Sequence, residues 1–124
     1  ALALLNDITY VEAARSLAQR MLLETIPQSK DSLAQADLDA ATIASIRLGF
    51  DLVALRQPTD SELKTLVEGY QSYLQYYQEQ PDQAVALLQM GQSQADPQVE
   101  PTRLAAMTSV ASILLNLDEA LTKE

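Results

Sequence analysis

Apolar side chains recur every three or four residues along most of this chain, which is the spacing that places them on one face of an α-helix. The first such segment follows Asp7, a common N-cap residue, and stops before Pro27, so a helix is predicted over about residues 8–26. A second segment of helical periodicity runs from about Leu38 to Leu55. Each segment has one apolar and one polar face, so each needs a packing partner.

The clearest local signal lies between Pro58 and Glu62, where one helix ends and the next begins. Pro58 interrupts the preceding helix, and Thr59 is a favourable N-cap residue. Because Glu62 follows three positions later, a capping box between Thr59 and Glu62 is predicted. The helix that follows is expected to end near Gln80. The residues expected on its buried side are Leu63, Leu66, Val67, Tyr70, Tyr73, Leu74 and Tyr77.

Two further helices are predicted in the last third of the chain. Pro81 suits the first position of a short helix, and Gly91 is a natural residue to end it. The polar stretch 92–100 is predicted to be a loop, after which Pro101 opens the last helix. Apolar residues of that helix repeat every three or four positions: Leu104, Met107, Val110, Leu114, Leu117 and Leu121.

Five amphipathic segments with no strand pattern predict an all-α fold, a single compact bundle of about five helices. Residues 1–124 are long enough to form one domain with its own core. Two glycines, Gly49 and Gly69, fall inside predicted helices. We expect both to permit a close crossing with a neighbouring helix.

Composition and charge exclude several classes of function. The chain of 124 residues has a formal net charge of −9 and a pI near 4.3, so nucleic acid and anionic membranes are not expected partners. It contains no Cys and no His, which excludes thiol and imidazole catalysis and the common zinc and haem ligand sets. No apolar run is long enough to span a membrane. No catalytic residue, cofactor or metal is predicted within these residues.

Carboxylates are the remaining groups with catalytic potential. Acidic residues near the predicted helix starts have an ordinary structural role, because their negative charge is stabilised by the positive end of the helix dipole. Solvation near the chain end or a closing helix cap is one interpretation of Asp118 and Glu119. The other joins them with Asp7, because an antiparallel arrangement of helices could bring the two ends of the chain together. Together the three acids form a candidate acidic site, because paired carboxylates act in glycoside hydrolysis when about 5–10 Å apart.

Tyrosines are concentrated on the third predicted helix. Tyr70, Tyr73 and Tyr77 share one face, and Tyr76 lies away from it. One interpretation is core packing with the hydroxyls at the rim of the core. The other is a candidate interaction face for a sugar, another domain or a second copy of the chain, since tyrosine offers a large contact area and a hydroxyl.

Three blocks of sequence together resemble a known family: LLNDITYVEAARSLAQRML at 4–22, IRLGFDLVALRQPTDSEL at 46–63 and TSVASILLNLDEALTKE at 108–124. They are similar to the planctomycete-specific C-terminal domain of unknown function that closes large exported proteins, many of which begin with a cytochrome-c-like module. Family members often have glycine where this chain has Leu55. That departure suggests that the second helix ends differently here.

The resemblance implies an exported origin and a position as the C-terminal fragment of a larger protein. Upstream domains of the same polypeptide would be its partners, and one of them would carry the haem or another catalytic centre. Our first hypothesis is therefore a non-catalytic helical module that packs on those domains. The alternative is that Asp7, Asp118 and Glu119 contribute carboxylates to a hydrolytic or carbohydrate-binding site shared with them.

Overall fold

The computed structural model describes the backbone of residues 8–25, 35–90 and 99–122. Side chains are described for residues 11–25, 39–90 and 99–117. The helices are α1 (Ile8–Thr25), α2 (Gln35–Ala54), α3 (Asp60–Glu79), α4 (Pro81–Leu88) and α5 (Pro101–Thr122). No strand occurs in these ranges, so the prediction of an all-α fold with five helices is confirmed. The expected role of Gly91 falls outside the described residues.

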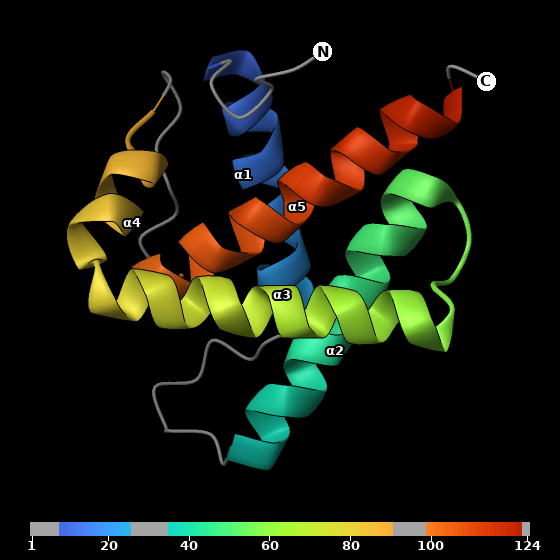
Figure 1. The fold of residues 1–124 in the computed structure, drawn as a ribbon, viewed down its shortest axis with the longest axis horizontal. Coiled ribbons are helices and arrows are strands. Elements are labelled where there is room, and N and C mark those ends of the chain that lie inside the picture. The colour runs from blue at the N-terminus through green and yellow to red at the C-terminus, as the bar shows by residue number, and fades with distance from the viewer. Residues whose placement is uncertain (1–7, 26–34, 91–98, 123–124) are drawn as a thin grey trace.

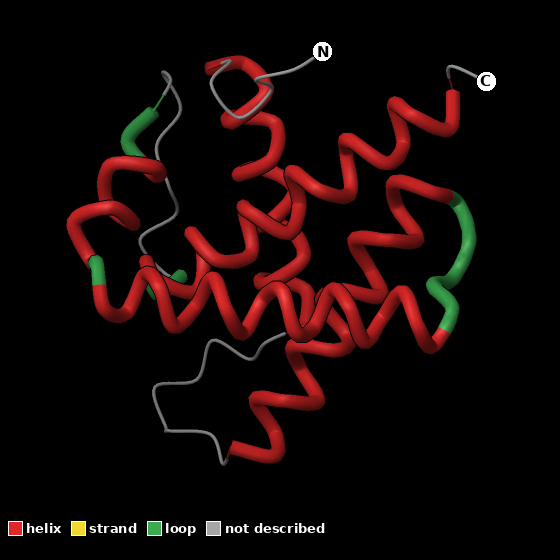
Figure 2. Tube along the Cα trace, in the orientation of Figure 1, coloured by secondary structure: helices red, strands yellow, loops and turns green. Residues whose placement is uncertain are grey.

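Short connections join α2 to α3 and α3 to α4, as Figure 2 shows. The predicted capping box at the start of α3 is confirmed. The Glu62 amide donates to Thr59 Oγ1 at 3.1 Å, and the Thr59 amide donates to Glu62 Oε1 at 2.8 Å. Pro81 occupies the first turn of α4, where its missing N–H costs no helical hydrogen bond.

Helix α5 is the centre of the fold. It packs against each of α1, α2, α3 and α4, and it crosses α1 in Figure 1. It is buried on all sides at residues 104–107, because Leu104, Ala105, Ala106 and Met107 are four consecutive residues without solvent exposure. The buried face of α5 is shorter than the sequence predicted, because Leu117, which was expected on that face, is 43% exposed.

The two helical glycines have different surroundings. A Cβ atom built on Gly49 would lie 2.5 Å from Met21 Cε and 3.1 Å from Leu114 Cδ1, so α2 approaches α1 and α5 closely at this position. The same atom on Gly69 would meet nothing within 4 Å. The expected close crossing is therefore confirmed at Gly49 and wrong at Gly69, whose missing side chain faces open space.

Helix α2 ends at a leucine whose backbone is left-handed, which is unusual for a residue other than glycine. Leu55, the residue after its last turn, has a φ of 60° and donates its amide to Asp51 O at 2.9 Å. This left-handed conformation is the common way to end a helix, and glycine usually provides it. Leu55 takes the conformation that glycine most often takes at a helix end, and the expectation that α2 ends differently from the helix of the resembling family stays a prediction.

A buried arginine joins the first helix to the end of α4. Arg15 is 1% exposed, and its Nη1 donates to Leu88 O at 2.7 Å and to Met90 O at 3.0 Å. The last carbonyls of a helix lack partners within the helix and carry partial negative charge, so a guanidinium is well suited to them. Arg15 thereby caps α4 from α1, 73 residues away along the chain from Leu88.

Candidate functional site

A small pocket opens where the end of α2 and the start of α3 meet α5. Its volume is about 110 Å³. We call it the corner pocket. It is lined by Phe50, Val53, Ala54, Arg56, Glu62, Leu114 and Leu117. Five of these residues are apolar, so the pocket has an apolar interior and a charged pair as its polar part.

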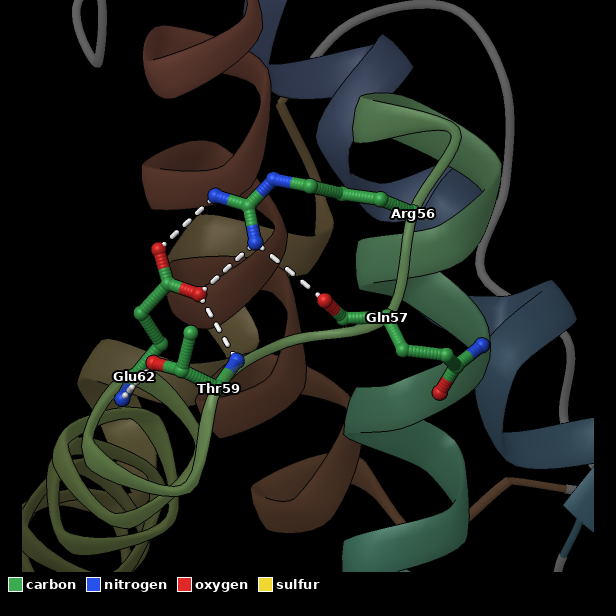
Figure 3. A network of polar contacts seen from close by, with 4 residues as sticks. All are labelled: Arg56, Gln57, Thr59 and Glu62. Carbon is green, nitrogen blue, oxygen red and sulfur yellow. Dashed lines mark hydrogen bonds and ion pairs between the residues drawn. The ribbon is translucent and has the colours of Figure 1, made fainter.

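The charged pair is bidentate. Arg56 Nη1 and Nη2 donate to Glu62 Oε1 and Oε2, each at 2.9 Å, and Nη1 also donates to Gln57 O at 3.2 Å (Figure 3). Glu62 Oε1 accepts the Thr59 amide as well. One carboxylate thus fixes both the start of α3 and the guanidinium at the end of α2, which gives the connection between them a defined shape.

The contacts of Glu62 change its acidity. Hydrogen bonds from Arg56 and then from the Thr59 amide lower the pKa of Glu62 from 4.5 to about 2. The same hydrogen bond raises the pKa of Arg56. Both groups are therefore fully ionised at neutral pH. This arrangement leaves Glu62 a poor general acid or base, because its carboxylate already has strong donors.

Arg56 also forms one wall of the corner pocket. Its guanidinium carbon lies 4.8 Å from the centre of the Phe50 ring, a distance at which cation–π attraction operates. Two sets of contacts, with Glu62 and with Phe50, hold the side chain in place although it is about half exposed. The pocket wall is thus already formed in the unbound chain.

Exposed apolar residues occur in the pocket lining and close to it along the chain. Leu55 is 85% exposed and lies between two lining residues, Ala54 and Arg56. Leu117 belongs to the lining itself, and Ile113 precedes it by one helical turn with 37% exposure. The pattern of the sequence indicated none of these as surface residues, because a leucine or isoleucine at helical spacing is ordinarily in the core.

The tyrosine face is turned toward the core. Tyr70 is 3% exposed, and burial raises its pKa to about 12, against smaller opposing effects of Arg103 and of a hydrogen bond with Thr42. Tyr73 and Tyr77 are partly buried and pack against the core, and the Tyr77 hydroxyl lies 3.5 Å from Ser109 Oγ. Core packing therefore accounts for these three rings. An additional role in binding stays a prediction.

The acidic site predicted from the sequence is not tested by the structure. Asp7 lies outside the described residues. Asp118 and Glu119 belong to α5, but their side chains lie outside the description as well. Among the side chains that are described, no three acids come together in a way that could hold a metal ion. None of the described helices combines the length and hydropathy that crossing a membrane requires.

Comparison with known proteins adds no further assignment. No family model matches this chain, no curated protein is significantly similar to it, and no solved structure matches its fold.

Proposed function

We propose that this chain is a non-catalytic helical interaction module of a larger exported polypeptide, in which it packs on the upstream domains. The observation that carries this proposal is the exposed apolar surface at the corner pocket. A leucine with 85% of its surface in water stands beside an apolar pocket, and neither is covered by any described residue of this chain.

The chemistry of the described residues supports a binding role over a catalytic one. The two groups whose pKa values change most, Glu62 and Tyr70, are engaged in structure: Glu62 caps α3 and pairs with Arg56, and Tyr70 is buried in the core. The sequence has no Cys or His to serve as a nucleophile or base. A perturbed pKa at a site without a reactive partner is typical of structural contacts.

The test compares the full polypeptide with a version that lacks residues 1–124. We expect the shortened protein to melt at a lower temperature, and the separately produced 124-residue chain to restore the melting temperature when added. If the two parts form no complex and the shortened protein is equally stable, the proposed function is wrong.

A further inference from the structure

We draw no further inference here: the strongest candidate, the corner pocket between the end of α2, the start of α3 and α5, has balanced charges around it, and nothing in the structure shows what covers its apolar interior.

Discussion

Leu55 combines a left-handed backbone with a side chain that lies in water. For a residue with a Cβ atom this conformation costs about 1–2 kcal/mol, whereas glycine adopts it freely. Glycine also gives the unfolded chain about 0.5–1 kcal/mol of additional conformational freedom. We therefore predict that Leu55→Gly stabilises the chain by about 0.5–1 kcal/mol, measured by urea unfolding.

Leu55→Ala is the control for that variant. Alanine also removes the exposed side chain but keeps the Cβ atom that makes the conformation unfavourable. We expect its free energy of unfolding to change by less than about 0.5 kcal/mol. Equal stabilisation by glycine and alanine would show that side-chain exposure, and not the backbone, is responsible.

The Glu62 carboxylate makes stability depend on pH. Its pKa is about 2 in the folded chain and 4.5 in the absence of its contacts, so the folded state binds this proton more weakly than the unfolded state. The contribution is therefore complete above about pH 4.5 and is lost as the pH falls toward 2. We predict that the difference in urea midpoint between the unaltered chain and Glu62→Gln is largest at neutral pH and shrinks over this acidic range.

Glu68→Gln, on the exposed side of the same helix, controls for a general effect of removing an acidic charge. It is expected to change the urea midpoint at neutral pH less than Glu62→Gln does. A carbon-detected NMR titration measures the Glu62 pKa directly, and a value near 4.5 would contradict the contacts described here.

At the scale of single elements, Gly49 and Gly69 make a matched pair. Alanine at either position gains about 1 kcal/mol of helix propensity. At Gly49 the new Cβ atom would overlap Met21, which is fully buried, and overpacking costs about 1–3 kcal/mol. We predict that Gly49→Ala destabilises the chain by about 1 kcal/mol and that Gly69→Ala stabilises it by about 0.5–1 kcal/mol, both by thermal or urea unfolding.

Shortening the Met21 side chain tests whether its overlap with the new Cβ atom is the reason that Gly49→Ala destabilises the chain. In a chain that already carries Met21→Val, Gly49→Ala is expected to lose most of its destabilising effect, because the Cε and Sδ atoms of Met21 are gone. Additive effects of the two substitutions would point to a different cause.

The elements were predictable because their signals are local. The proline at the start of α4 and the capping box at Thr59 and Glu62 act within a few residues, so the sequence contains all that is needed to locate them. Gly69 shows the limit. A glycine inside a helix has the same appearance in sequence whether or not another helix passes close to it, and only the packing of the elements decides this.

At the scale of the whole molecule, Arg15 holds α4 in place from α1. Its removal leaves the carbonyls of Leu88 and Met90 without these donors, and an unsatisfied buried acceptor costs about 1–3 kcal/mol. We predict that Arg15→Met lowers the free energy of unfolding by about 2 kcal/mol and accelerates hydrogen exchange in α4 more than in α2.

Arg20→Met is the comparison on the same helix. Arg20 is exposed and pairs with Glu24 one turn away, a surface pair whose contribution is about 0.3–0.5 kcal/mol. We expect a correspondingly small change and no effect on exchange in α4. Equal effects of the two substitutions would contradict the capping role of Arg15.

The candidate site was less predictable than the fold. The sequence predicted the capping box of Thr59 and Glu62, but the corner pocket also needs Leu114 and Leu117, which follow more than fifty residues later. Leu117 fits the apolar spacing of the last helix and was expected to be part of that face. Its exposure results from the direction in which α5 leaves the core, and no local pattern contains that information.

The central position of α5 has a consequence for synthesis. The four helices that surround it precede it in the chain, so they leave the ribosome before their common packing partner exists. Until residues through about Leu114 have emerged, the apolar faces of the earlier helices lack the surface that they cover in the finished molecule. A nascent chain in this state exposes surface that favours aggregation and attracts chaperones. Packing of these five helices is therefore completed only after α5, the helix that the other four contact, has emerged.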